Sequence, residues 1–372
     1  NSSLKHRHSS KRFFSQSTRI FKSISNEELA KSHGSWARID LSAIEANAKF
    51  FSRFGRLMSV IKADGYGHGA LQVGLAAQKG GSAEFAVARA DEAVDLRKNH
   101  FNQPLLLFGY CPTNVIPFLI EKDVAFTVWD VEQFKEIQSI AKKLKKPAKI
   151  HVNVNSGMNR LGVDVDEQNF SEFENLCKQL YKAHQSKQIE WNGLYTHFAS
   201  ADDTESRVTD KQLKIFNPAV DVVRSQFDDL NLTIHASNSA GTLTRGSCDF
   251  DMNRVGISLY GLQPNPDVDL LSGADVRAAL SWYTQVTQVR EHDEVGAGIS
   301  YGHHYRTEEP GEQIATCSVG YADGFRRGVE NFVIINNQLC SVVGRVTMDQ
   351  IMIKIPKKLR NKVTRGTVVT LI

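Results

Sequence analysis

Eight apolar runs, separated by stretches of helical pattern, constrain the fold of this chain more than any other feature of its sequence. Several runs are apolar without alternation, which is typical of parallel strands buried on both faces. Strands that alternate with helices predict an α/β fold, and eight of them favour a closed (β/α)8 barrel over a doubly wound open sheet. The runs cover residues 57–63, 84–89, 104–110, 124–130, 149–155, 191–197, 232–238 and 252–260, and the helical stretches include 70–80, 90–99, 131–145, 170–184 and 209–227.

The pattern changes after about residue 275, where short β-type runs separated by Gly and polar turns replace the alternation. We therefore predict a barrel over residues 35–275 and a mainly β domain over residues 276–372. The first strand, residues 35–41, fits either domain, and Ser42 is expected to cap the helix that follows it. The last run stops at Ile372, so the β domain is expected to be truncated, with weakened cofactor binding and activity. The β-type runs cover residues 281–290, 313–319, 332–343, 348–355 and 367–372.

The net charge of +4 belongs to the first residues of the chain and not to its body. Residues 1–26 are rich in Ser and contain no acidic residue, and they carry six of the basic ones, Lys5, Arg7, Lys11, Arg12, Arg19 and Lys22. A nearly neutral body argues against a nucleic-acid partner. The composition of residues 1–34 predicts a disordered tail, with an organelle transit peptide as the alternative.

Bulk composition is that of a soluble protein, with 41% hydrophobic and 23% charged residues. No apolar run approaches the roughly 20 residues that span a bilayer, so no membrane partner is expected. The five cysteines are scattered singly, which argues against a disulfide framework and against a zinc ribbon. Reduced thiols are typical of the cytoplasm, and this is the predicted location unless the tail directs the chain to an organelle.

The most informative local segment is residues 57–69, where an apolar strand leads directly into a glycine-rich turn at Lys62. Partial burial at a strand end lowers the pKa of an ammonium and makes the amine a better nucleophile. Gly65, Gly67 and Gly69 permit unusual backbone angles beside a ligand. Tyr66 lies four residues after Lys62, where its hydroxyl could reach the same ligand.

Residues 59–69, which contain Lys62, resemble the cofactor-lysine motif of alanine racemases. Further similar motifs follow in the family's order, from about Trp36 to the last residue. The resemblance implies a barrel followed by a β domain, a pyridoxal 5'-phosphate cofactor, and interconversion of L-alanine and D-alanine. The motifs are SVIKADGYGHG (59–69), NSGMNRLG (155–162), THFA (196–199), HASNSA (235–240), NRVGI (253–257), GISYG (298–302), VGYADG (319–324) and GRVTMD (344–349).

The resemblance assigns most cofactor contacts to the barrel, whose strand ends converge at one face. Lys62 carries the cofactor covalently, and Arg254 faces the pyridine nitrogen. A guanidinium does not readily give up a proton, so this nitrogen stays unprotonated. His197 extends the polar chain from Arg254, with a core histidine as its alternative reading. The phosphate is assigned to Tyr66, Asn238, Ser239, Gly256 and Ile257, near a helix N-terminus at Asn238 and Ser239.

Racemisation needs a base on each face of a planar intermediate, and the resemblance assigns these roles to Lys62 and to Tyr301 of the partner subunit. It therefore implies a homodimer with shared active sites. Arg160 and the amide of Met348 are assigned to the substrate carboxylate, and Tyr321 to the entrance. For Met348, a place in the β-domain core is an equal alternative.

One position departs from the family pattern. Many relatives have a modified lysine seven residues before the arginine that matches Arg160, and this chain has Asn153 there. Arg160 must then be oriented by the Asn153 amide or by a bound anion.

Three alternatives remain open beside alanine racemisation. They are a broader amino-acid racemase, a non-catalytic pyridoxal-phosphate carrier and a metal-dependent barrel hydrolase. Tyr301 argues against a carrier, and the lack of a spaced ligand set argues against a metal.

Overall fold

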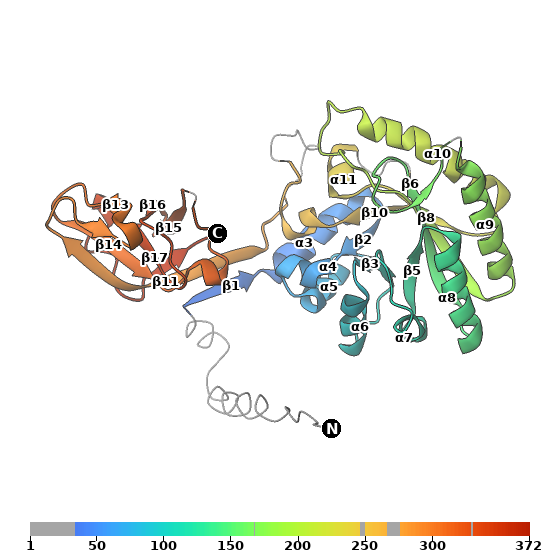
Figure 1. Ribbon diagram of the computed structural model, residues 1–372, viewed down its shortest axis with the longest axis horizontal. Helices are drawn as coiled ribbons and strands as arrows, with labels where there is room; N and C mark the ends of the chain where they lie inside the picture. The colour runs from blue at the N-terminus through green and yellow to red at the C-terminus, as the bar shows by residue number, and fades with distance from the viewer. Residues whose placement is uncertain (1–33, 167, 246–249, 266–275, 329) are drawn as a thin grey trace, which may run out of the picture. The chain divides into compact units, whose positions relative to one another are not determined.

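The computed structural model describes residues 34–166, 168–245, 250–265, 276–328 and 330–372 of the chain. It divides into two compact units (Figure 1). One unit is Asp40–Ala279, and the other joins Ser35–Ile39 to Leu280–Ile372. The predicted tail, residues 1–34, lies outside the described residues except for Gly34.

The first unit is a closed parallel barrel, which confirms the predicted fold. Its strands pair in chain order, and β10 pairs with β2 to close the ring, which excludes the open sheet. The two-residue strand β7 (Val163–Asp164) adds to β6 outside this ring. The barrel strands are β2 (Arg56–Val60), β3 (Glu84–Val87), β4 (Leu105–Leu107), β5 (Val124–Val128), β6 (Ala148–Asn155), β8 (Ile189–Tyr195), β9 (Thr233–His235) and β10 (Met252–Val255).

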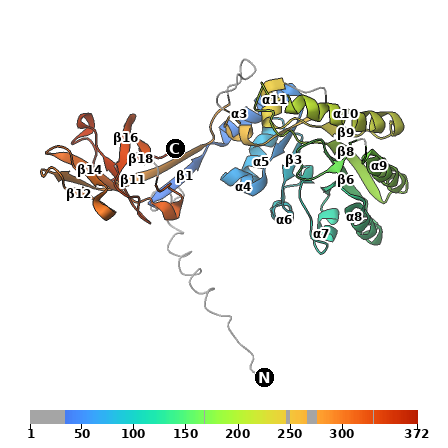
Figure 2. The same cartoon turned by 45° about the horizontal axis from the view of Figure 1, so that its top comes forward.

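Helices follow the strands and lie outside the ring, as α8, α9 and α10 do around β6 and β8 (Figure 2). All five helical stretches expected from the sequence form helices. Two short helices, α7 (Ile116–Glu121) and α11 (Ser239–Arg245), were not expected as such. The others are α3 (Leu41–Phe51), α4 (Lys62–Gly67, which is left-handed over Ala63–Tyr66), α5 (Ala70–Lys79), α6 (Ala90–Lys98), α8 (Val131–Leu144), α9 (Phe170–Gln185) and α10 (Val208–Gln226).

The predicted cap of the first helix was wrong by two residues. The N-cap of α3 is Asp40, whose carboxylate accepts from the amides of Ser42 (2.9 Å) and Ala43 (3.2 Å). An ionised carboxylate at a helix N-terminus is a stronger acceptor than a hydroxyl and also interacts favourably with the helix dipole. Asp40 therefore takes the capping role that the sequence analysis gave to Ser42.

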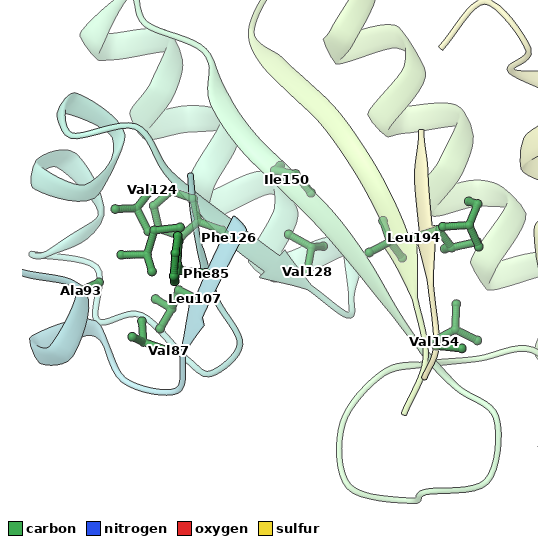
Figure 3. Packing of buried hydrophobic residues seen from close by; sticks show 14 of the residues in the cluster. Phe85, Val87, Ala93, Leu107, Val124, Phe126, Val128, Ile150, Val154 and Leu194 are labelled. Carbon is green, nitrogen blue, oxygen red and sulfur yellow. The ribbon is translucent and has the colours of Figure 1, made fainter. Parts of the chain in front are cut away.

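The barrel strands are buried on both faces, which explains their apolar runs. In β5, Val124, Phe126 and Val128 pack in the main core between strands and helices, and Ala125 faces a second core inside the barrel. Figure 3 shows Val124 and Phe126 beside Phe85 of β3. Successive side chains of a strand point to opposite faces, so a strand with two apolar surroundings loses its polar alternation.

The second unit is a mainly antiparallel sheet. The strand β1 (Ser35–Ile39) pairs with β11 (Leu280–His292), so it joins this unit, and the barrel unit runs from Asp40 to Ala279 where the sequence suggested residues 35–275. The remaining strands of the sheet are β14 (Glu312–Cys317), β15 (Phe332–Ile335), β16 (Gln338–Val343), β17 (Ile351–Lys354) and β18 (Val368–Thr370), and β12 (Gly298–Ile299) pairs separately with β13 (Tyr305–Arg306).

One predicted strand of this unit was wrong. Residues 332–343 form a hairpin of β15 and β16 and not a single run. The turn is made by Asn336 and Asn337, which have φ angles of 47° and 59°. Asn is enriched in this left-handed region, and two such residues in succession are typical of a tight hairpin turn.

Neither a membrane span nor a metal-ligand cluster is found in the described part of the chain. No helix there is both long and apolar enough to cross a bilayer. Within the same residues, no group of three or more His, Cys, Asp or Glu side chains is arranged to hold a metal ion.

Candidate active site

Lys62 begins a left-handed turn at the end of β2. The next four residues, Ala63, Asp64, Gly65 and Tyr66, have φ angles of 52°, 51°, 61° and 52°. Glycine adopts this conformation freely, whereas each other residue costs roughly 1–2 kcal/mol in it. Such a turn persists only where its surroundings fix it, and such sites cluster where function demands an unusual backbone.

The side chain that fixes the turn is Glu92 of α6. Its Oε1 accepts from the amide of Ala63 (2.6 Å), and its Oε2 accepts from the amides of Ala88 (3.0 Å) and Arg89 (3.1 Å). One carboxylate thus ties the residue after Lys62 to the end of β3. The sequence analysis missed Glu92, although its place three residues after Arg89 is the capping-box position of a helix.

A cavity of about 500 Å³ opens where the barrel strands end. Its lining includes every site residue that the sequence analysis placed in the barrel, so the structure brings these residues together. They are Lys62, Tyr66, Arg160, His197, Asn238, Ser239, Arg254, Gly256 and Ile257. Asn153, Phe108 and Tyr195 line the same cavity.

Ser239, Gly256 and Tyr66 form one wall of this cavity. The Ser239 hydroxyl accepts from the amide of Gly256 (3.0 Å). The sequence analysis assigned Gly256 to the phosphate, but its amide already has this partner. The hydroxyl keeps its own hydrogen to donate. A Cβ at Gly256 would lie only 2.6 Å from the phenol oxygen of Tyr66, so only glycine leaves this space open. Ile257 begins the short helix η3 (Ile257–Tyr260), and its N–H has no partner within that helix.

Packing and burial fix the Tyr66 phenol in its donor form. Its ring lies 4.8 Å from the ring of Tyr260, whose hydroxyl donates to the carbonyl of Val60 (3.1 Å). Burial raises the pKa of Tyr66 above its ordinary value of 10.0, so the phenol keeps its hydrogen at neutral pH. Asn238 in turn caps α11, because its Oδ1 accepts from the amide of Gly241 (2.9 Å). A hydroxyl, a phenol and a helix start are a donor set that fits a phosphate.

Arg254 is the most firmly held cation of the cavity, with 2% of its surface exposed. Its Nη2 donates to the carbonyls of Thr196 (2.7 Å) and Ala236 (3.0 Å) and to Nδ1 of His197 (3.2 Å). Its Nη1 donates to Nδ1 of His235 (3.1 Å). The Nε–H has no acceptor among the described residues, so it is a donor that a ligand in the cavity can use. Burial lowers the pKa of Arg254 to about 10, and the side chain is still a cation at neutral pH.

Two neutral histidines accept from Arg254. Burial is the main cause that lowers the pKa of His197 to about 3 and that of His235 well below 6.5. Each ring can therefore offer a lone pair to the guanidinium. His197 is a member of the polar chain, which supports its assignment over that of an isolated core histidine. His235 lies in a motif that the sequence analysis quoted, but only the folded strands show that it contacts Arg254.

Arg160 is exposed and its side chain has no hydrogen bond or ion pair with any described residue. In particular, no hydrogen bond joins it to Asn153, so of the two expected ways to orient Arg160 the structure does not show the Asn153 amide, and a bound anion remains a prediction. Asn153 extends from β6 into the barrel mouth and reaches the cavity independently. Arg160 is thus a free cation at the cavity, available to a carboxylate.

The other three predicted residues lie in the second unit. Tyr301 and Met348 line a surface concavity together with Asp349, and they are 69% and 53% exposed. The exposure of Met348 excludes the alternative that it fills the β-domain core. Tyr321 begins the short helix η5 (Tyr321–Asp323), where its amide donates to the carbonyl of Thr347 (3.0 Å) and its ring stacks under Arg327.

Comparison with known proteins agrees with this arrangement. The sequence model of the alanine racemase N-terminal domain matches residues 39–264, and that of the C-terminal domain matches residues 279–372. Alanine racemase 1 of Oceanobacillus iheyensis is 35% identical and covers 90% of this chain and 88% of its own length. The alanine racemase of Methanococcus maripaludis is 37% identical, with 87% of this chain and 85% of its own length covered.

Solved structures give the same result. The crystal structure of alanine racemase from E. faecalis superimposes with a TM-score of 0.81 at 32% identity, covering 92% of this chain and 89% of that one. The two family models together match residues 39–264 and 279–372, which is most of the chain. The chain therefore belongs to the alanine racemase family of isomerases.

Proposed function

We propose that the protein interconverts L-alanine and D-alanine with pyridoxal 5'-phosphate held at the mouth of the barrel. The observation that carries this proposal is the cavity itself, in which Lys62, a phosphate-binding wall and the buried cation Arg254 surround one space. Membership of the family supplies the substrate, since the matching relatives are named alanine racemases.

The residues present fit the cofactor. Lys62 would attach it, and Tyr66, Asn238, Ser239, Gly256 and Ile257 surround the place for its phosphate. The absent Cβ of Gly256 leaves the space between Ser239 and Tyr66 open. When bound, pyridoxal phosphate withdraws electrons from the substrate and so makes its Cα hydrogen removable.

Arg254 sets the chemical character of the site. Its free Nε–H suits an acceptor nitrogen, and a guanidinium donates a hydrogen bond without transferring the proton. Arg254 would therefore leave the ring nitrogen of a bound cofactor unprotonated, which would weaken its electron withdrawal. We expect this to disfavour side reactions such as transamination.

Two groups would move the proton. Lys62, once released from its attachment, serves one face of the substrate, and Tyr301 from the partner subunit serves the other. Cationic neighbours favour the charged form of a phenol, so such groups beside Tyr301 would help it to act as a base. This role requires a homodimer with shared active sites, which the family membership supports.

Arg160 and the amide of Met348 would bind the substrate carboxylate, and Tyr321 would line the entrance. An arginine without a protein partner can form a bidentate pair with a carboxylate, which fixes the orientation of the substrate. Asn153, which does not bind Arg160, leaves room beside it for an anion. We place the protein in the cytoplasm, without a nucleic-acid or membrane partner, unless the basic N-terminal residues direct it to an organelle.

A combined trapping and chirality experiment tests the proposal. The purified protein is mixed with pyridoxal phosphate, reduced with borohydride and digested, and the modified lysine is identified by mass spectrometry. A parallel sample receives D-alanine, and L-alanine formation is followed. We expect modification at Lys62 and racemisation that borohydride abolishes. Modification without racemisation would favour a carrier, and faster turnover of serine, lysine or arginine would favour a broader racemase.

A further inference from the structure

A third buried histidine lies behind the Arg254 and His235 pair. His151 is on β6, is 4% exposed, and packs edge-on against the ring of His235 on β9. Its Nδ1 is 3.0 Å from Nε2 of His235. Arg254, His235 and His151 thus form a chain that runs from the cavity into the interior of the barrel.

Arg254 determines which atom donates and which accepts in each hydrogen bond of this series. Arginine has only N–H donors, so Nδ1 of His235 must present a lone pair to Nη1 of Arg254. A neutral imidazole carries one hydrogen, which must then be on Nε2 of His235. This hydrogen points at Nδ1 of His151, which must in turn be a lone pair. His151 is therefore the acceptor that satisfies the buried Nε2–H of His235.

The opposite tautomer of His235 would break its contact with Arg254. Its Nδ1–H would then face a guanidinium N–H, which has no lone pair to accept it. Buried donors that face each other are unsatisfied and unfavourable in a low dielectric. The arrangement also requires that His151 is neutral, and burial lowers its pKa to about 3.

The neighbouring strand is shaped to admit the His151 ring. The pairing of β6 with β8 shifts its register between Ile150 and His151. On β8, opposite this shift, Gly193 has no side chain, and a Cβ there would overlap Nδ1 of His151 and the carbonyl of Thr233. Glycine within a strand often marks a place where another group approaches closely. The register shift and the missing side chain of Gly193 together make space for the His151 ring.

We propose that His151 is a positioning residue: its Nδ1 lone pair accepts the Nε2–H that His235 must carry when it accepts from Arg254, and His235 is thereby held in place to support Arg254 at the cofactor site. The inference deepens the proposed function and rests on it for the role of Arg254. The hydrogen-bond chain itself rests on the geometry of the barrel alone.

The first test measures the tautomers directly. The protein is labelled with ¹⁵N-histidine, and the ring nitrogens are observed by NMR without and with pyridoxal phosphate, with signals assigned from single-histidine variants. We expect His151 and His235 both to be Nε2–H at neutral pH. An Nδ1–H form of His235 would overturn the proposal.

The second test compares three substitutions in the holoenzyme. In His151→Asn, an amide oxygen can take the place of Nδ1, whereas in His151→Gln the amide lies further out, near the place of Nε2. His151→Leu has no acceptor. We expect His151→Leu to lower kcat by about 10- to 100-fold, the range for groups that orient a functional residue from behind. The KM for alanine should not change, because Arg254 does not bind the substrate carboxylate.

The conservative variants keep the proposal falsifiable if the leucine variant does not fold. His151→Asn should retain most of the wild-type kcat and pyridoxal-phosphate affinity, and His151→Gln should be close to the leucine variant. Equal kcat values for the Asn and Gln variants, or a wild-type kcat for His151→Leu, would contradict the proposal. A wild-type protein that binds cofactor but does not racemise alanine would defeat the proposed function, and the NMR tautomers would then decide the role of His151 alone.

Discussion

The barrel mouth and the β-domain concavity differ in how firmly each holds its side chains. Arg254 in the barrel is buried and makes four hydrogen bonds, and Lys62 begins a left-handed turn that Glu92 holds. Tyr301 in the concavity is 69% exposed, and its side chain has no hydrogen bond to a described residue. One region is preorganised by its own strands, and the other is not.

The difference indicates where the chemistry of the site is set. Preorganised donors cost no reorganisation when a ligand binds, so the barrel alone can determine cofactor binding. An exposed phenol can act as a base only when other groups surround it. We therefore assign cofactor binding to one unit and the second base to the other, with the partner subunit completing its surroundings.

The largest effect is expected from a substitution at the barrel mouth. Lys62→Ala removes the attachment of the cofactor and one of the two bases, so activity should fall by at least about 10⁴-fold. Racemisation and visible absorbance after gel filtration with pyridoxal phosphate measure both losses. Lys135→Ala, which changes an exposed lysine on α8, serves as the control and should leave both unchanged. Retained activity in Lys62→Ala would exclude Lys62 from catalysis.

A smaller effect is expected from the β-domain half. Tyr301→Phe should lower kcat by about 10²- to 10⁴-fold, the usual contribution of a general base. Cofactor affinity and melting temperature should not change, because the hydroxyl of Tyr301 has no partner among the described residues. Tyr321→Phe, in the short helix η5, should affect kcat much less. A loss of cofactor affinity in Tyr301→Phe would contradict the separation of the two halves.

Acid should destabilise the barrel through its buried histidines. The pKa values of His151 and His197 are lowered to about 3, and that of His235 is lowered in the same direction, from 6.5 in the unfolded chain. At a pH between about 3 and 6.5, these histidines are protonated in the unfolded chain and neutral in the folded protein, so the unfolded state binds more protons than the folded state. The free energy of unfolding should therefore fall as pH decreases from 6.5 toward 3, by about 1.4 kcal/mol per pH unit for each histidine.

Urea titrations between pH 4 and pH 7.5 measure this slope. His151→Leu should remove about one third of it. An unchanged slope in His151→Leu would show that His151 is not held neutral in the fold.

The smallest expected effect concerns the phosphate wall. In Gly256→Ala the new methyl group lies 2.6 Å from the phenol oxygen of Tyr66, so the free energy of unfolding should fall by about 1–3 kcal/mol. Adding Tyr66→Phe removes that oxygen and should recover most of the loss, which a double-mutant cycle measures. Strictly additive losses would show that the two residues are not in contact.

The sequence predicted the barrel well because each strand carries its own signal. A run such as Val124–Val128 is apolar on both faces, and this signal does not depend on its neighbours. The hairpin of β15 and β16 was missed because its turn, Asn336 and Asn337, interrupts the apolar pattern for only two residues. Turn chemistry at those two positions was the available signal.

The site was predicted only where a residue could be recognised locally. Lys62 and Arg254 stand in distinct motifs, whereas Glu92 and His151 act through contacts with residues that are 29 and 84 positions away. No periodicity or motif in the sequence predicts such hydrogen bonds, because they form where separate strands and helices meet in the fold. The absence of a bond between Asn153 and Arg160 is likewise visible only in the fold.

Hydrogen exchange at Cα tests most directly whether each unit supplies one base. The Tyr301→Phe variant is loaded with pyridoxal phosphate in D₂O, and L-alanine and D-alanine are offered separately. We predict that one enantiomer exchanges its Cα hydrogen for deuterium through Lys62, that the other does not, and that conversion of either is at least about 10²-fold slower than in the wild type. Conversion at the wild-type rate, or loss of exchange in both enantiomers with the cofactor bound, would contradict the account.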